Sequence, residues 1–189
     1  AGSMRFTLGY TEPGVTAKGS LGSFGSRRYF TAYHPAGSTD ATFGAFEVAS
    51  TDGFGPSRAA RHASGMAQTT YDFGSGVTGR VLASAYAGRF DSAGVLRLDD
   101  IEAGKVDRLA TYDSKPGGYS SRAQLVLELK SEAEPSAARK PISWSVTPYV
   151  VARSLKLRSN WTGFLYDSIA GDSVQQRNGA TTLGATAAF

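Results

Sequence analysis

The chain has 189 residues, including 23 glycines, 7 prolines and no cysteine, and its 20 Lys and Arg residues outnumber its 16 Asp and Glu residues. This length is enough for one domain with a sizeable core, and the lack of cysteine excludes disulfides and thiolate metal sites. The positive excess is mild and dispersed, so it does not indicate a nucleic-acid-binding protein. No apolar run approaches the roughly 18 residues of a transmembrane helix.

The first residues of the chain are set apart from the rest. Residues 1–3, ahead of Met4, are typical of a cloning remnant, which makes residues 4–189 a single domain or a segment of one. Any natural signal peptide is then expected to lie outside this sequence.

Alternation of apolar and polar residues with a period of two predicts strands, whereas helical periodicity never persists beyond two turns. In chain order the predicted strands are 15–22, 27–34, 41–50, 61–73, 77–91, 120–130, 142–158 and 178–189. Residues 4–11 are a further candidate, and an alternative interpretation joins 15–34 into one long strand. The faces of 27–34 and 41–50 stay unassigned, because aromatic residues occur on both.

The later strands have one apolar face each. In the predicted strand 120–130 this face carries Ala123, Leu125, Leu127 and Leu129. In 142–158 it carries Ile142, Trp144, Val146, Pro148, Val150 and Ala152, and in 178–189 it carries Leu183, Ala185, Ala187 and Phe189. Within 142–158 the apolar positions shift by one residue near Arg153, to Leu155 and Leu157, and a β-bulge would explain the shift.

The predicted connections differ in length between the two ends of the strands. One end has residues 35–40, 74–76 and 131–141, and the other has the tight turn 23–26 and the longer loops 51–60, 92–119 and 159–177. Short turns at one end and long loops at the other are typical of outer-membrane barrels, although 131–141 is longer than that pattern favours. Glycines and the sequence KPGG at 115–118 predict a loop without regular structure at 92–119.

Strand length and aromatic placement also favour a membrane barrel. The predicted strands have roughly 8–17 residues, where a membrane strand needs about 9–11 and a mean soluble strand has about 5–6. Aromatic residues near strand ends resemble an interfacial girdle: Tyr71, Phe73, Trp144, Trp161, Phe164 and Phe189. The predicted fold class is therefore all-β, a transmembrane antiparallel up-and-down barrel with about eight strands in this chain. A soluble β-barrel binding protein is the alternative that alternation alone does not separate.

Several segments, in order, resemble the early barrel strands and loops of TonB-dependent outer-membrane receptors. They are GSLGSFGSRRYFTAY, ASTDGFGPSRAAR, ASAYAGRFDSAGVLRLDDI and LKLRSNWTGFLYD followed by GDSVQQRNGATTLGA. The resemblance implies surface ligand binding and solute uptake in a full-length receptor, with MRFTLGYTEPG as the tail of a plug or an extra strand. Such receptors have 22 strands and a plug, which needs more than about 400 residues. The chain is therefore expected to be a segment of a receptor or a small, filled eight-stranded barrel serving as a structural or surface-interaction module.

This interpretation also predicts a location and partners. It places 92–119 and 159–177 outside the cell and both termini in the periplasm. The expected partners are outer-membrane lipid and lipopolysaccharide, an unidentified small ligand, and the barrel assembly machinery, which would recognise Phe189. TonB is a further partner if the full-length protein has a plug. No cofactor and no nucleic acid are expected.

Two groups of candidate functional residues follow from the topology. Polar residues of the long loops are candidate ligand contacts: Arg97, Asp99, Asp100, Arg108, Tyr112 and Trp161. Polar residues opposite the apolar strand faces are a candidate network in the lumen, where buried charge must be paired: His62, Gln68, Arg122, Gln124, Glu128, Lys130 and Arg153. Arg80 is a further position for this network.

No catalytic or metal-binding motif is apparent. His34, next to Pro35, is expected to be a solvated turn residue, and no nucleophile elbow or spaced acid–base pair occurs, so the protein is not expected to be an enzyme. Four loop acids are interleaved with three bases, which favours a solvated loop with local ion pairs over a cation site: Asp99, Asp100, Glu102 and Asp107 among Arg97, Lys105 and Arg108.

Overall fold

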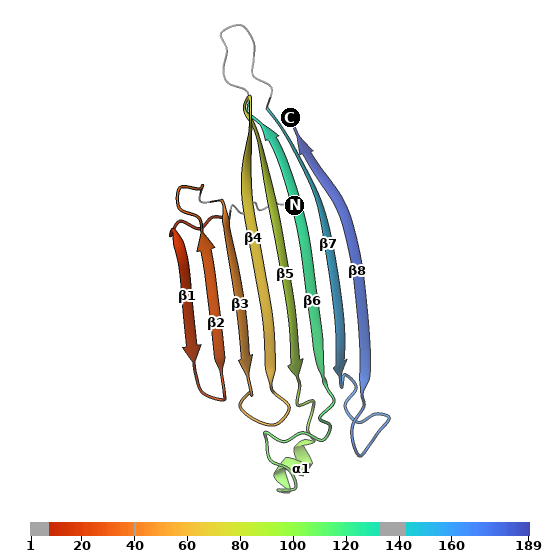
Figure 1. Cartoon of the computed structure of the whole chain (residues 1–189). Coiled ribbons are helices and arrows are strands. Elements are labelled where there is room, and N and C mark those ends of the chain that lie inside the picture. The colour runs from red at the N-terminus through yellow and green to blue at the C-terminus, as the bar shows by residue number, and fades with distance from the viewer. Residues whose placement is uncertain (1–7, 40, 133–142) are drawn as a thin grey trace.

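The computed structural model describes residues 8–39, 41–132 and 143–189 as one antiparallel sheet with a single short helix (Figure 1). The eight strands pair with their sequence neighbours in the order β1-β2-β3-β4-β5-β6-β7-β8. Their bounds are β1 Gly14–Leu21, β2 Arg27–His34, β3 Phe43–Thr51, β4 Ala60–Gly74, β5 Val77–Asp91, β6 Gly117–Ser131, β7 Trp144–Ser159 and β8 Val174–Ala188, with helix α1 at Leu98–Glu102.

The all-β, up-and-down prediction is confirmed, and each predicted strand has a counterpart. Residues 8–11 are not in a strand, while 4–7 of that candidate lie outside the described residues. The single strand 15–34 is wrong, because a turn closed by Gly22 N–H and the Ser26 carbonyl separates β1 from β2. Within the described residues, no helix is long and apolar enough to cross a membrane.

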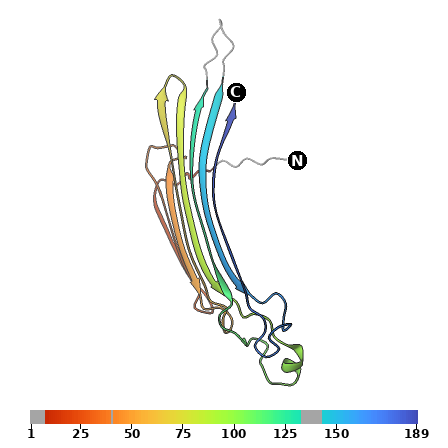
Figure 2. The ribbon, with the colours of Figure 1, turned by 90° about the vertical axis from the view of Figure 1, so that its right-hand side faces the viewer.

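The sheet is not a closed barrel. Within the described residues β1 and β8 do not pair, so each leaves one edge of its backbone free, and the sheet is a bent open wall (Figure 2). Only Ala32 and Phe43 are buried hydrophobic residues in the described part of the chain. The expectation of a closed eight-stranded barrel filled by side chains is therefore wrong for this structure.

Strand register is nearly continuous across the whole sheet. The one shift separates Asp72 from Gly74 in the pairing of β4 with β5. Strand β7 keeps a constant offset to β8 from Ser145 to Ser159, so the predicted bulge near Arg153 is wrong. The β6–β7 ladder skips the position of Pro148, which has no N–H to donate, and then resumes with the same offset.

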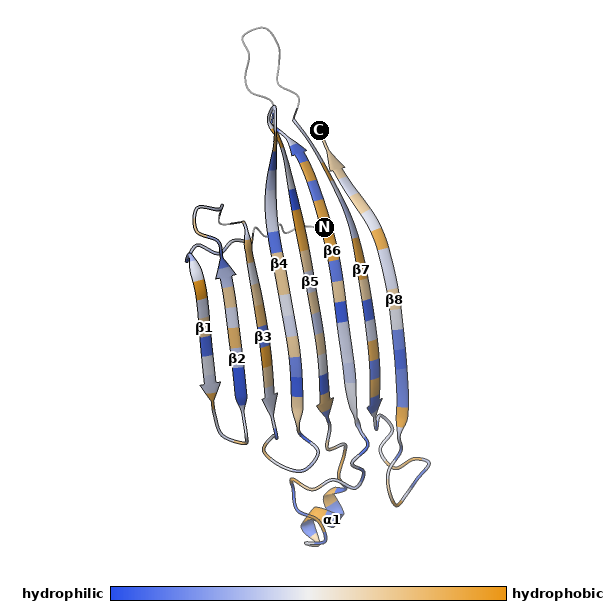
Figure 3. Ribbon diagram, viewed as in Figure 1, coloured by the Kyte–Doolittle hydropathy of each residue, from blue (hydrophilic) through white to orange (hydrophobic). Residues whose placement is uncertain are grey.

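Constant register sorts the side chains onto two faces. The apolar face is defined by Leu125, Leu127 and Leu129 of β6 together with the residues paired in register with them, and the polar face is the opposite one. Both colours of the hydropathy scale alternate along the longer strands (Figure 3). The three leucines remain 40–43% exposed, so nothing in the described structure covers them.

The polar face carries charged residues along most of its height. They come from seven of the eight strands, and they are Lys18, Arg28, Glu47, His62, Asp72, Arg80, Arg122, Glu128, Lys130 and Arg153. Leu155 and Leu157 also lie on this face, because β7 does not change phase.

Aromatic rings lie over glycines on the polar face. Tyr149 is directly opposite Gly184, and a Cβ built on Gly184 would collide with the tyrosine ring. Phe90 is opposite Gly118, where a Cβ would lie 2.8 Å from the phenylalanine ring. Glycine at these positions leaves space for a ring to lie flat on the neighbouring strand.

The ends of the strands agree with the predicted division of the connections. One end has 35–42, 75–76 and 132–143, and the other has 22–26, 52–59, 92–116 and 160–173. We call the latter the loop end. The expectation that 92–119 has no regular structure is wrong in part, because α1 lies inside it and β6 begins at Gly117. Asp99 and Asp100 occupy the first turn of α1, where acidic residues are favoured.

Replacing Gly184 by alanine should destabilise the sheet, because the added methyl group forces Tyr149 to move. We expect a loss of about 1–3 kcal/mol in the free energy of unfolding, measured by urea denaturation. Gly179→Ala in the same strand is the matched control, since its Cβ would meet only the Arg153 carbonyl at 3.7 Å. Equal stability of the two variants would contradict the ring-over-glycine packing.

Candidate functional site

Ion pairs between neighbouring strands organise the polar face. Arg80 Nη2 lies 2.9 Å from Glu128 Oε2, and Glu128 is only 9% exposed. Glu47 bridges two further partners, accepting from Arg28 and lying 3.1 Å from His62 Nε2. Pairing of this kind offsets the cost of holding charge in a partly covered site.

The seven residues predicted for the lumen network all lie on the polar face, but they form several separate contacts. Arg122 donates to Gln124 at 3.2 Å, and Lys130 Nζ is 2.6 Å from Glu132 Oε1. The partners Glu47 and Arg28 were missed, because the aromatic residues of β2 and β3 hide the alternation of those strands. The strand register places all seven predicted residues on the polar face: His62, Gln68, Arg122, Gln124, Glu128, Lys130 and Arg153.

The segment that precedes β1 lies against the polar face. The Tyr10 ring is 6.5 Å from the Phe43 ring, and Gln68 Nε2 donates to the carbonyls of Leu8 and Ala41. Gln68 is only 3% exposed. Residues 8–13 therefore run over the polar face rather than extending the sheet.

The solvated-turn expectation for His34 is wrong. His34 is only 4% exposed, and its Nδ1 lies 2.7 Å from the Thr42 carbonyl oxygen. The contact comes from Thr42, next to the start of β3, which proximity to Pro35 in the sequence did not indicate.

At the loop end, the two longest loops contact each other. Arg97 donates to the Ser168 carbonyl at 3.1 Å, and its guanidinium lies 5.4 Å from the centre of the Phe164 ring. Tyr112 meets the same ring edge-on at 5.7 Å. Phe164 is thus the residue that joins the loops, and its assignment to a girdle at a strand end is wrong.

A third loop is attached to the same assembly. Arg58, in 52–59, donates to the Leu109 carbonyl at 2.6 Å and lies over the Phe54 ring. Loops 52–59, 92–116 and 160–173 therefore form a continuous row, which we call the loop cap.

Asp100 is the charged centre of the loop cap. Its carboxylate accepts from the Tyr112 hydroxyl at 2.5 Å and from Lys105 at 3.3 Å. The Tyr112 hydrogen bond, more than the ammonium of Lys105, lowers the pKa of Asp100, and the same bond raises the pKa of Tyr112. The arrangement keeps the acid ionised and the phenol protonated, which suits binding through hydrogen bonds rather than proton transfer.

Three of the six predicted ligand contacts meet in the loop cap, and three do not. Arg97, Asp100 and Tyr112 lie around Phe164 or one another. Asp99 and Arg108 are exposed, and Trp161 is 64% exposed. Within the described residues, no group of three or more His, Asp or Glu side chains is placed to hold a metal ion.

Asp172 orders the loop between β7 and β8. This residue is 7% exposed, and it accepts hydrogen bonds from the Thr162 hydroxyl and from three successive backbone N–H groups, those of residues 165–167. The Thr162 hydroxyl, followed by the backbone donors, lowers the pKa of Asp172. The sequence does not predict this role, because an acid in a loop gives no sign of the backbone N–H groups from which it will accept hydrogen bonds.

No known protein family, curated protein or solved structure matches the chain. The features that bear on function are therefore the two faces of the sheet and the loop cap.

Replacing Asp172 by asparagine should loosen 160–173, since a neutral amide is a weaker acceptor for several backbone donors. We expect faster chymotrypsin cleavage at Trp161, Phe164 or Tyr166 and roughly 10–100-fold faster amide exchange at residues 165–167. Because the folded-state pKa is lowered, the contribution of Asp172 is present above its ordinary value of 3.8 and is lost as pH falls through the lower folded value. Asp99→Asn, in the neighbouring loop, is the control, and an equal effect from both variants would contradict the role of Asp172.

Proposed function

We propose that this chain is a section of the wall of an outer-membrane β-barrel of the TonB-dependent receptor type. In this proposal the apolar face meets lipid, the polar face lines the lumen, and the loop cap faces the outside of the cell. The protein then acts non-enzymatically, in surface ligand binding and solute uptake in its full-length context. The observation that carries the proposal is an uncharged band on the exposed apolar face.

The height of this band agrees with a bilayer. On β6 it extends from Ser121 to Ser131, and the residues paired in register with these positions across the sheet carry no charge. Ten residue-to-residue rises of about 3.4 Å, tilted by about 40°, give a height of about 26 Å, against an apolar band of about 25 Å in membrane barrels. Tyr71, Phe73 and Trp144 lie near the turn end of the band.

The polarity of the two faces reverses at the loop end of the band. On β7, Leu155 and Leu157 lie on the polar face, while Lys156 and Arg158 lie on the apolar face. In water the exposed leucines of β6 would form a large apolar patch without a cover, which soluble proteins rarely retain. In a membrane, both the band and its abrupt charged end are expected.

The two free edges favour a section of a larger barrel over a small filled one. Strand β8 has 15 residues, and its outer edge has no strand partner among the described residues. Unpaired N–H and C=O groups are costly in lipid, so further strands are needed beside β1 and β8. In the proposed full barrel, the segment 8–13 on the polar face lies where a plug would approach, and TonB is a partner if such a plug exists.

The loop cap is the proposed ligand surface. Arg97, Asp100 and Tyr112 are held in place by partners in both long loops, and Arg108 and Trp161 are exposed around them. Fixed charges and aromatic rings of this kind favour a polar solute held by hydrogen bonds and ion pairs. The other proposed partners are the lipopolysaccharide around the barrel and the barrel assembly machinery, which would recognise Phe189.

Leu127→Arg tests the lipid-facing assignment. An arginine near the middle of the band should cost about 2–4 kcal/mol of stability in phospholipid vesicles, measured by urea unfolding. Leu82→Arg is the matched control, since Leu82 lies on the polar face at a neighbouring level. If Leu127→Arg inserts and unfolds like the parent, or if it only improves solubility in water, the membrane proposal is wrong.

The proposed orientation has a separate test in intact cells carrying the full-length protein. Lys105 and Arg108 are exposed in the loop cap, so trypsin added outside should cleave there. No cleavage is expected after Arg139 or Lys140, which lie outside the described residues. Cleavage only at the latter pair would reverse the orientation, and mass spectrometry of the fragments distinguishes the two patterns.

A further inference from the structure

A single row of cations crosses the loop end of the apolar face. Register places one residue from each strand in this row, which we call the basic row: Leu21, Arg27, Ser50, Arg61, Arg89, Tyr119, Lys156 and Arg177. Five of the eight are cations and none is an acid, although the next rows into the band carry no charge. The charges therefore lie where the proposed membrane surface begins.

The basic row lacks internal neutralisation. All five cations are exposed, and none lies within 4.0 Å of a carboxylate among the described residues. Arg61 and Arg89 are directly opposite each other on neighbouring strands, and Lys156 and Arg177 form a second such pair. Like charges in directly opposite positions destabilise a sheet, so bound anions would stabilise this row.

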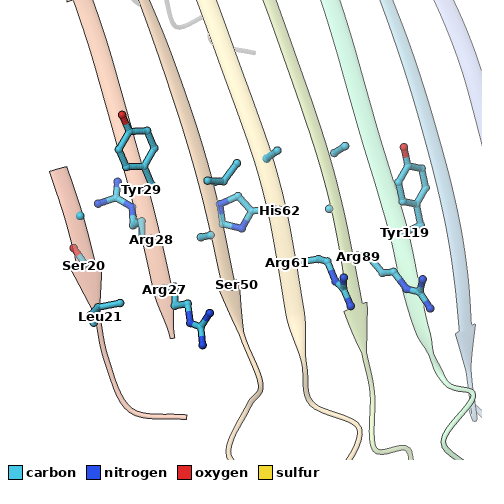
Figure 4. Close-up of a pocket in the computed structure, with 16 residues that line it drawn as sticks. Ser20, Leu21, Arg27, Arg28, Tyr29, Ser50, Arg61, His62, Arg89 and Tyr119 are labelled. Atoms are coloured by element: carbon cyan, nitrogen blue, oxygen red, sulfur yellow. The ribbon is translucent and has the colours of Figure 1, made fainter. Parts of the chain in front are cut away.

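A hollow adjoins the basic row on the side of the apolar band. It measures 830 Å³, and its lining includes Arg61 and Arg89 together with Tyr29 and Tyr119. In Figure 4 the two arginines extend toward the loop end, whereas the two tyrosines extend the opposite way along the strands. Between the tyrosines the floor is made by small side chains, Ala63 and Ala87 among them.

The hollow continues along β4 and β5 into the apolar band. A second hollow of 590 Å³ shares Ala63 and Ala87 with the first and extends past Gly65 and Ala85 to Ala67 and Ala83. The distance from Arg61 to Ala67 is six residues, or about 20 Å along the strand. The surface is therefore a trough of small residues with two arginines at its loop end and Phe46 in its lining.

We propose that this surface binds a phosphorylated glycolipid of the outer leaflet, the lipid A part of lipopolysaccharide. Its phosphates contact Arg61 and Arg89 and extend toward Lys156 and Arg177, while one acyl chain lies in the trough over Ala63 and Ala87. Guanidinium groups pair with phosphate through charge-assisted hydrogen bonds, and the trough supplies contact for hydrocarbon. The inference rests on the proposed function for the orientation of the sheet in the membrane.

The length of the basic row favours this lipid over one with a single phosphate. From Arg27 on β2 to Arg177 on β8 there are six strand spacings of about 4.8 Å, or about 29 Å along the sheet. One phosphate occupies one opposed pair of cations, so a headgroup with two phosphates uses more of the row. The loop end is also the end proposed to face outward, where this glycolipid resides.

Lipid binding is tested with the full chain in detergent micelles that contain bis-phosphorylated lipid A, with bound lipid counted by native mass spectrometry. Exchanging Arg61 and Arg89 for glutamine together should weaken lipid A binding roughly tenfold or more. The control exchanges Arg122 and Arg153 for glutamine, since these two arginines are also directly opposite each other but lie on the polar face. The control should bind lipid A like the parent.

Further probes separate the sources of phosphate. Dephosphorylated lipid A should bind at least tenfold more weakly than lipid A, and phosphatidylglycerol should bind more weakly and depend less on Arg61 and Arg89. Equal loss in the control pair, unchanged binding in Arg61→Gln with Arg89→Gln, or equal binding of phosphatidylglycerol would each overturn the proposal. Vesicle insertion of every variant is measured separately, so failure of the parent chain to insert counts against the proposed function, whereas failure to bind lipid A in micelles counts against this inference.

Discussion

The backbone ladder, with its almost unbroken register, is the constraint on which every other feature depends. Because neighbouring strands keep a constant offset, residues of one parity in each strand form level rows across the sheet. A slip of one residue in a single strand would move half of its side chains to the other face. The uncharged band, the basic row and the ion pair of Arg80 with Glu128 depend on this register, and the one shift, between Asp72 and Gly74, lies at the turn end of β4, where the band ends.

The two faces place opposite demands on their surroundings. The polar face brings Arg28 and His62 to Glu47 and brings Arg80 to Glu128, which leaves it compatible with water or a polar plug. The apolar face exposes its leucines and ends in a row of cations that have no acidic partner within the described part of the chain. Water alone leaves the apolar face uncovered. The proposed membrane setting would satisfy both faces, with lipid against the apolar band and anionic headgroups at the level of the cations.

The sequence was sufficient for the order of the strands, the division of loops between the two ends, and the faces of the later strands, because Leu125, Leu127 and Leu129 alternate with polar residues. It was insufficient for β3, where Phe43 and Phe46 lie on opposite faces and obscured Glu47. Leu155 and Leu157 suggested a bulge, because a reversal of polarity along a regular strand has the same pattern as a change of phase. The loop cap was predicted only in part, since the contacts of Arg97 and Asp172 with distant backbone groups leave no periodic signal.

The strands differ in length in a way that shapes the rim of the wall. Pairing between β3 and β4 ends at Phe43 and Gln68, yet β4 continues through residues 69–74, so β4–β8 extend about 20 Å farther along the strand direction than β1–β3. The far rim is therefore stepped rather than level. A bilayer of uniform thickness would meet a notch beside β4, and lipids there would have to thin locally or leave the rim to another part of the protein. Strands β1–β3 also pair over fewer residues than β4–β8, so they form the sector of the wall that separates at least cost in backbone hydrogen bonds.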